Sequence, residues 1–252
     1  MSLSNKALQH SVPSPWAEKE EAFDTLFSVL TLCYPKPVPP MLDYRILPVT
    51  PFAQNACLLW DDASGDAVIT DPGGEVDRLL HEARAQRVRL RAVWLTHAHI
   101  DHAGGAAELA QRAGVPIIGP HRDDQFWIDM LPQQARMFGF APAQAFTPER
   151  WLVDGDRLQL GELEFEVRHC PGHTPGHVVF HHAPARRAWV GDVLFAGSIG
   201  RTDFPRGDHQ QLIDSIVTRL WPMGDDTVFI PGHGPESSFG VERRSNPYVG
   251  GT

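Results

Sequence analysis

The sequence predicts an α+β domain in which two β-sheets pack together with helices on the outside. Short apolar runs bounded by Pro, Asn, Asp and Gly are typical of strands, and they fall into two clusters along the chain. Segments with apolar residues at helical spacing accompany each cluster. Because each sheet must bury an apolar face, this order favours two packed sheets covered by helices.

The first cluster combines strands and helices. Its first three strands are expected at Tyr44–Thr50, Cys57–Trp60 and Ala67–Thr70. A helix follows, with one apolar face made by Val76, Leu79, Leu80 and Ala83. Residues Leu90–Leu95 predict a buried strand that leads directly into His97. A second helix begins after Gly104–Gly105 and ends at Gly114, which is a favourable residue beyond a helix C-terminus.

The second cluster is richer in strands. A helix is expected around 126–131, and residues 139–150 are expected to form a loop. The strands that follow are expected at Trp151–Val153, Arg157–Leu160, Leu163–Arg168, His177–His181 and Ala188–Val190. A further amphipathic helix has an apolar face made by Leu212, Ile213, Ile216, Val217 and Leu220. The last strand, Thr227–Ile230, leads to His233.

Charge and cysteine content limit the possible functions. The formal net charge of −9 argues against a broad phosphate-binding surface, so no nucleic-acid partner is expected. Three widely spaced cysteines, Cys33, Cys57 and Cys170, do not form a disulfide framework, which fits a reducing cytoplasm. The longest apolar run, Leu26–Leu32, is far too short for a membrane-spanning helix, so no membrane partner is expected. Nothing in the sequence specifies an oligomeric state.

Residues 1–40 differ from the rest of the chain. They contain the runs SVPSPW and PKPVPP, and proline cannot pair within a central strand. One short helix within Glu18–Leu32 is the only element expected there. We therefore divide the chain into an N-terminal extension, 1–40, and a single domain, 41–252, and we hypothesise that Met41 is the natural start.

Seven residues with metal-binding side chains follow predicted strands. They are His97, His99, Asp101, His102, His173, Asp192 and His233. Imidazole and carboxylate are ligands that Zn²⁺ and similar divalent cations prefer. In an extended segment His97 and His99 point the same way, whereas Asp101 and His102 turn toward the next helix. One loop can thus serve two metal ions. Two nearby histidines, His169 and His177, are expected in supporting roles rather than as ligands.

The motif HxHxDH at 97–102, followed by His, Asp and His at long spacings, resembles the metallo-β-lactamase superfamily over about residues 43–249. The stretches HCPGHTPGHVVF and GDVLFAGSIGRTDFPRGDH are most similar to short glyoxalase II-like, or hydroxyacylglutathione hydrolase-like, enzymes. The resemblance implies a four-layer αββα sandwich. It implies one metal held by His97, His99 and His173, and a second held by Asp101, His102 and His233. Asp192 would bridge the two.

The activity implied by the resemblance is hydrolysis of a glutathione thioester such as S-lactoylglutathione. The expected cofactors are two divalent ions, zinc in the first place and iron or manganese as alternatives, with a bridging hydroxide as nucleophile. Asp101 would aim that hydroxide. Arg201 is expected to clamp a substrate carboxylate or to form an ion pair with Asp203 or Asp208. Only residues 234–252 follow His233, so the C-terminal helical domain of full-length glyoxalase II is not expected.

Single residues argue against other activities known in the superfamily. True metallo-β-lactamases usually have Cys where Asp192 stands, and oxygen-reducing diiron members usually have Glu where His99 stands, so neither chemistry is expected. The main alternative is a mononuclear-iron dioxygenase acting on glutathione persulfide, a class that also resembles GRTDF at 200–204. A non-catalytic, metal-stabilised binding module is disfavoured because Asp101 and Asp192 are both present.

Overall fold

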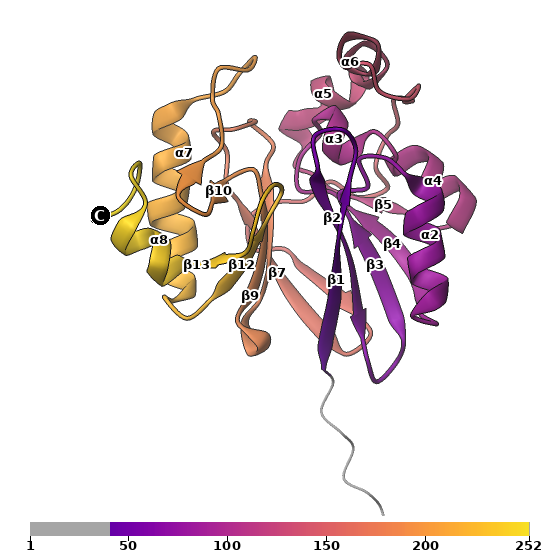
Figure 1. Ribbon diagram of the computed structural model, residues 1–252, viewed down its shortest axis with the longest axis horizontal. Coiled ribbons are helices and arrows are strands. Elements are labelled where there is room, and N and C mark those ends of the chain that lie inside the picture. The colour runs from indigo at the N-terminus through magenta and orange to yellow at the C-terminus, as the bar shows by residue number, and fades with distance from the viewer. Residues whose placement is uncertain (1–40, 252) are drawn as a thin grey trace, which may run out of the picture. The chain divides into compact units, whose positions relative to one another are not determined.

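The computed structural model describes residues 41–251, in which two β-sheets are flanked by helices (Figure 1). Residues 1–40 and 252 lie outside the described part of the chain. The helix expected within Glu18–Leu32 and the proposed extension therefore lie outside it as well. The architecture of the described part is the αββα sandwich that the sequence predicts.

The first sheet has five strands in sequential order. They are β1 (Leu42–Val49), β2 (Gln54–Asp61), β3 (Asp66–Thr70), β4 (Arg89–Trp94) and β5 (Ile117–Ile118). The first three pair antiparallel, and β3, β4 and β5 pair parallel. The helices α2 (Val76–Ala85) and α4 (Ala106–Ala113) cover its outer side (Figure 1). The predicted apolar face of α2 is buried, as expected from its spacing.

The second sheet has six strands in the order β13-β12-β9-β8-β7-β6. Their bounds are β6 (Arg157–Leu160), β7 (Leu163–His169), β8 (Val178–His182), β9 (Arg187–Gly191), β12 (Val228–Pro231) and β13 (Ser237–Ser238). Strands β9 and β12 pair parallel, and the other neighbours pair antiparallel. A two-stranded ribbon, β10 (Leu194–Phe195) and β11 (Ser198–Ile199), follows β9. Helices α7 (His209–Ser215) and α8 (Phe239–Ser245) cover the outer side of the sheet (Figure 1).

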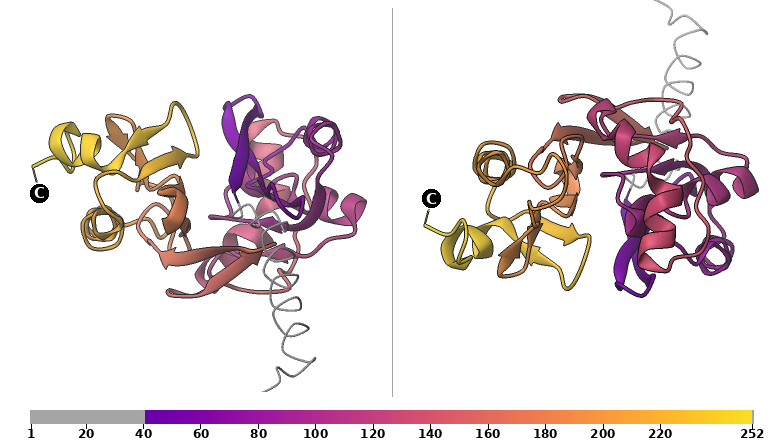
Figure 2. Two further views of the ribbon diagram at one scale, coloured as in Figure 1. Left: turned by 90° about the horizontal axis from the view of Figure 1, so that it is seen from below. Right: turned by 90° about the horizontal axis from the view of Figure 1, so that it is seen from above.

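An aromatic cluster joins the inner faces of the two sheets. Trp94 of β4 contacts Phe165 of β7 and Phe180 of β8, with ring centroids 5.1 and 5.3 Å apart. Figure 2 shows the sheets from their ends, with the helices on the outer sides. Separate apolar clusters lie between each sheet and its helices. These three layers of apolar contact fix the sheets, and hence the loops at the strand ends, relative to one another.

The structure corrects several sequence predictions. Trp151–Val153 is not a strand, and only a single bridge pairs Arg150 with Ile118. The buried side chain of Leu152 packs between the sheets, so its apolar character reflects burial without strand pairing. The single helix expected near 126–131 is two helices, α5 (Gln125–Asp129) and α6 (Leu131–Phe138). The break falls at Met130, and Pro132 lies in the first turn of the new helix, where proline is well tolerated.

Several short elements were not predicted from the sequence. Strands β5, β10, β11 and β13 have two residues each, which is too short to leave a periodic pattern, and the sequence did not predict them. Helix α8 was not predicted either. Cys57 and Cys170 are buried and free, as expected for small packed residues. Within 41–251, every helix falls short of the length and apolar character needed to cross a bilayer.

Candidate metal centre

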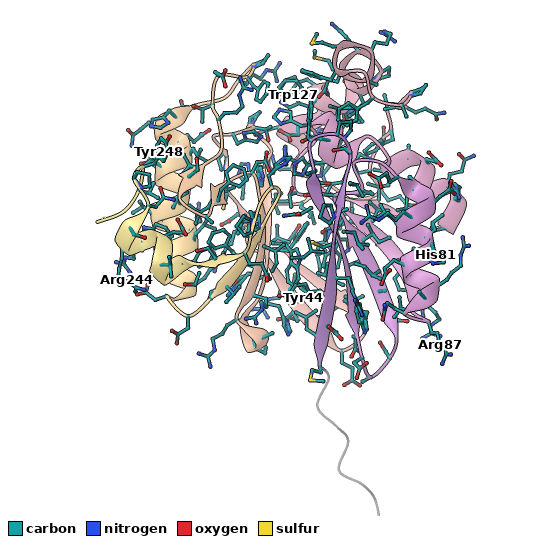
Figure 3. All side chains as sticks on the ribbon, in the orientation of Figure 1. Tyr44, His81, Arg87, Trp127, Arg244 and Tyr248 are labelled. Carbon is teal, nitrogen blue, oxygen red and sulfur yellow. The ribbon has the colours of Figure 1, made fainter. Side chains whose placement is uncertain are left out.

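The seven predicted ligands come together at one end of the two sheets. They are carried by the loop after β4, by α3 (Ile100–Ala103), and by the segments that follow β7, β9 and β12. Trp127 of α5, labelled in Figure 3, lies at this same end. Because the strands are held by packed cores on both faces, the loops at their ends present these side chains on a rigid support.

Two groups of three ligands form around Asp192. The side-chain donor atoms of His97, His99 and His173 all lie within 4.8 Å of one another, and so do those of Asp101, His102 and His233. Asp192 lies between the groups. Its Oδ1 is 3.3 Å from His102 Nε2, and its Oδ2 is 3.5 Å from His173 Nε2. The members of these two groups are those that the family resemblance assigns to the two ions, although the donor atoms of Asp71, His97 and His102 also lie within 4.8 Å of one another.

Four of the five histidines are oriented by a neighbour of their Nδ1 atom. His102 Nδ1 lies 3.0 Å from Asp71 Oδ2, and the Nδ1 atoms of His173 and His233 lie 2.7 and 3.1 Å from backbone carbonyls. His97 Nδ1 lies 3.1 Å from the Thr96 hydroxyl. An Nδ1–H that donates to such a partner leaves the Nε2 lone pair directed into the centre. This is the usual way in which proteins orient metal-binding histidines.

The inward-facing atoms fit divalent cations. The Nε2 atoms of His97 and His102, together with Asp192 Oδ1, are buried and have no hydrogen-bond partner. His99 instead faces the centre with Nδ1, which lies 3.0 Å from His173 Nε2. Each unpaired buried polar atom costs about 1–3 kcal/mol, so a cation shared among them would stabilise the centre. Gly232 keeps the space open, because a Cβ at this position would lie 2.1 Å from Asp192 Oδ1.

The pKa values of the histidines differ in direction between the two donor groups. Burial and the neighbouring imidazoles lower the pKa values of His97 and His99 well below the ordinary value. Burial also acts to lower the pKa of His102, but the charges of Asp192 and Asp101 outweigh it and raise the pKa well above the ordinary value. His102 is therefore the imidazole that holds a proton most tightly, and a cation must displace that proton to bind.

A buried carboxylate that the sequence analysis missed ties two ligand loops together. Asp124 accepts hydrogen bonds from the backbone N–H of Ala98, the Thr174 hydroxyl and the backbone N–H of Gly176, at 3.1, 2.9 and 2.7 Å. Burial raises the pKa of Asp124 to about 7. Ala98 lies between two predicted ligands, and Thr174 follows His173. No periodicity or spacing in the sequence marks Asp124 as different from its acidic neighbours.

The sequence analysis also did not predict that Asp71 would orient His102, although the position of Asp71 in the sequence could have indicated it. It directly follows β3, which pairs parallel with β4, so both strands deliver polar residues to the same sheet edge. Of the two histidines expected in supporting roles, His177 lies beside the centre, whereas His169 groups with His121 and Asp123. His177 Nε2 accepts the backbone N–H of Asp192 at 3.0 Å, and its ring stacks on His97. His169 Nε2 lies 2.8 Å from the Pro175 carbonyl.

A cavity of about 720 Å³ opens above the centre. Its floor includes five of the predicted ligands, namely His99, Asp101, His173, Asp192 and His233. Arg201 lines the cavity and also forms an ion pair with Asp203, so its side chain reaches the site while remaining partnered. The hydrogen bond and charge of Arg201 hold the pKa of Asp203 at about 2. The guanidinium lies 4.3 Å from the centre of the Phe204 ring.

The fold and the site define the class of protein. Residues 49–233 match the metallo-β-lactamase superfamily, and the chain belongs to it. Hydroxyacylglutathione hydrolase GloC of Haemophilus influenzae is 47% identical over 209 residues, which cover 82% of this chain and 98% of that protein. The chain is therefore a metal-dependent hydrolase of this superfamily.

Solved structures agree with this classification. The BLEG-1 B3 metallo-β-lactamase is 33% identical, with a TM-score of 0.77 over 83% of this chain and all of that one. TTHA1623 in a di-iron-bound form is 36% identical, with a TM-score of 0.74 over 81% of this chain and all of that one. ETHE1 from Myxococcus xanthus is 28% identical, with a TM-score of 0.68 over 83% and 85% of the two chains.

Proposed function

We propose that this enzyme hydrolyses hydroxyacyl thioesters of glutathione, of which S-lactoylglutathione is the simplest candidate, with two divalent metal ions. The observation that carries the proposal is the pair of three-residue donor groups with Asp192 between them, at the floor of an open cavity. The 47% identity to a hydroxyacylglutathione hydrolase supports the choice of substrate. We also propose a location in the reducing cytoplasm, in keeping with the free Cys57 and Cys170.

Each donor group would hold one ion. The assigned sets are His97, His99 and His173 for the first ion, and Asp101, His102 and His233 for the second, with Asp192 shared. Zinc is the expected ion, and iron or manganese would suit the same imidazole and carboxylate donors. Bound divalent ions supply Lewis acidity, which lowers the pKa of water toward ~7 and stabilises negative charge on a carbonyl oxygen.

The side chains of the chain itself position the reactants. Asp101 lines the cavity floor, and its Oδ2 lies 3.1 Å from His233 Nε2. A carboxylate there accepts a hydrogen bond from the attacking water and so directs its lone pair at the carbonyl carbon. Arg201 donates to Asp203 through Nε and Nη2, which leaves the Nη1 hydrogens for a carboxylate of the glutathione moiety.

A steady-state assay with S-lactoylglutathione tests the proposal. The metal-loaded enzyme should turn the substrate over, and the metal-free enzyme or the Asp192→Ala variant should not. Arg201→Ala should raise KM roughly tenfold or more, because a charge-assisted hydrogen bond is lost. Arg219→Ala is the matched control, since Arg219 is also an ion-paired surface arginine but lies outside the cavity lining. Full activity without metal would refute the proposal.

The second candidate is a mononuclear-iron dioxygenase acting on glutathione persulfide, which the GRTDF stretch at 200–204 and the similarity to ETHE1 favour. It requires one iron and consumes oxygen. The two candidates separate cleanly when metal content and oxygen uptake are measured on one preparation. Oxygen uptake with glutathione persulfide, at one iron per chain and without thioester hydrolysis, would replace the first candidate by the second. A β-lactam belongs in the same panel because of the similarity to BLEG-1.

A further inference from the structure

One wall of the cavity above the metal centre is made of exposed apolar side chains. Phe52, at the turn between β1 and β2, is 47% exposed, and Met137 and Phe138, at the end of α6, are 64% and 44% exposed. All three line the cavity. The ring centroids of Phe52 and Phe138 lie 6.2 Å apart. Apolar side chains gathered in this way, next to a reactive centre, mark a binding surface.

Further apolar side chains line the cavity besides those of the rim. Met130 and Trp127 line the cavity between the rim and the floor. The Trp127 ring meets the His99 ring edge-on, with centroids 4.6 Å apart. A hydrocarbon group attached to a carbonyl at the floor could therefore keep apolar contact along its whole length.

Charge complementarity assigns the two ends of the substrate. Among the residues of 41–251 that line the cavity, Arg201 is the only Lys or Arg, and it follows β11 of the second half of the domain. The apolar wall described above comes from the first half, from α5, α6 and the β1–β2 turn (Figure 1). Apolar residues of the second half also line the cavity, namely Phe195, Ile199, Phe204 and Pro205, but only that side offers a cation. Glutathione carries two carboxylates and one ammonium group, which would lose hydration against an apolar wall without gaining a partner. The glutathione moiety therefore lies toward Arg201, and the acyl group lies toward the wall.

We infer that the enzyme selects thioesters whose acyl group is an extended or aromatic hydrocarbon, packed against Phe52, Trp127, Met130, Met137 and Phe138. The inference rests on the proposed function and narrows its substrate class. A lactoyl group is small and polar and leaves this wall exposed to water. Each methylene group that the wall buries increases kcat/KM by up to about fourfold, since burial of one methylene is worth about 0.8 kcal/mol.

A series of acyl glutathione thioesters tests the inference with the metal-loaded enzyme. The acetyl, butanoyl and hexanoyl thioesters differ only in apolar length. For the unmodified enzyme, kcat/KM should rise at least about threefold for each added pair of methylene groups. In the Met137→Ser/Phe138→Ser double variant this dependence on chain length should flatten. Val153→Ser is the matched control, because Val153 is 52% exposed but lies outside the cavity lining, and it should keep the full dependence.

The possible outcomes separate this inference from the function on which it rests. Hydrolysis of the acetyl thioester with no gain for longer chains would overturn the inference alone. A gain that survives in the double variant would overturn it too, because another surface would then bind the chain. Failure to hydrolyse both this series and S-lactoylglutathione would overturn the proposed function and this inference together. A gain in the unmodified enzyme that the double variant loses would establish the wall as the acyl site.

Discussion

Replacement of the buried Asp124 by Asn should weaken metal binding while leaving the fold intact. The Asp124 carboxylate accepts three hydrogen bonds, two at Oδ2 from Ala98 N–H and the Thr174 hydroxyl, and one at Oδ1 from Gly176 N–H. An Asn side chain can keep its oxygen at the Oδ2 position, but its amide then faces the Gly176 N–H. The hydrogen bond from the Gly176 N–H is lost, and this N–H then faces the Asn amide N–H, so that two buried donors point at each other. We expect the free energy of unfolding to fall by about 1–3 kcal/mol.

The larger effect should be on the centre itself, because Asp124 holds the loops that carry His97, His99 and His173. Loss of a group that positions metal ligands typically costs roughly 10–100-fold in metal affinity or activity, and we expect a loss in this range. Competition with a fluorescent chelator would measure the affinity. Asp129→Asn is the control, since Asp129 is an exposed carboxylate in the neighbouring helix that pairs only with Gln125 among the hydrogen bonds found. Unchanged affinity in Asp124→Asn would refute the positioning role.

Further predictions follow from the same centre. Removal of metal by a chelator should lower the melting temperature, because ions at 100 times their Kd stabilise the folded state by about 2.7 kcal/mol; an unchanged calorimetric transition would contradict this. The carboxylates around His102 raise its pKa, so apparent metal affinity should fall as the pH decreases, and calorimetry in two buffers should detect proton release on binding. Gly232→Ala should lose bound metal, because its Cβ would lie 2.1 Å from Asp192 Oδ1; full metal content by elemental analysis would show that the gap is not required.

The sequence was sufficient to predict the layers of the fold, and it also singled out the seven side chains that the structure brings together. Apolar alternation and spacing marked the long strands and the helices α2, α4 and α7, because these elements bury one face each. The seven predicted ligands could be recognised because they follow the ends of strands, and the strands of packed sheets bring such loops to the same end of the domain. The assignment of two donor sets came from the resemblance to the superfamily, and the geometry of the sets agrees with it.

Other features depend on contacts between distant segments and left no local pattern. Asp124 resembles any surface carboxylate in sequence, and only its burial between two loops distinguishes it. Leu152 was assigned to a strand because burial and strand pairing produce the same apolar signal. The sequence did not predict the apolar wall of the cavity either. Phe52 and Phe138 are far apart in the chain, and only the fold brings their rings together.

A titration of the metal-free enzyme with zinc, followed by thioester hydrolysis at each addition, tests the two-ion centre most directly. If both donor groups hold an ion and Asp192 joins them, activity should rise until two equivalents have been added and then level off. The Asp192→Ala variant should not reach this activity at any zinc concentration. Full activity at one equivalent, or an undiminished Asp192→Ala variant, would contradict a two-ion hydrolase.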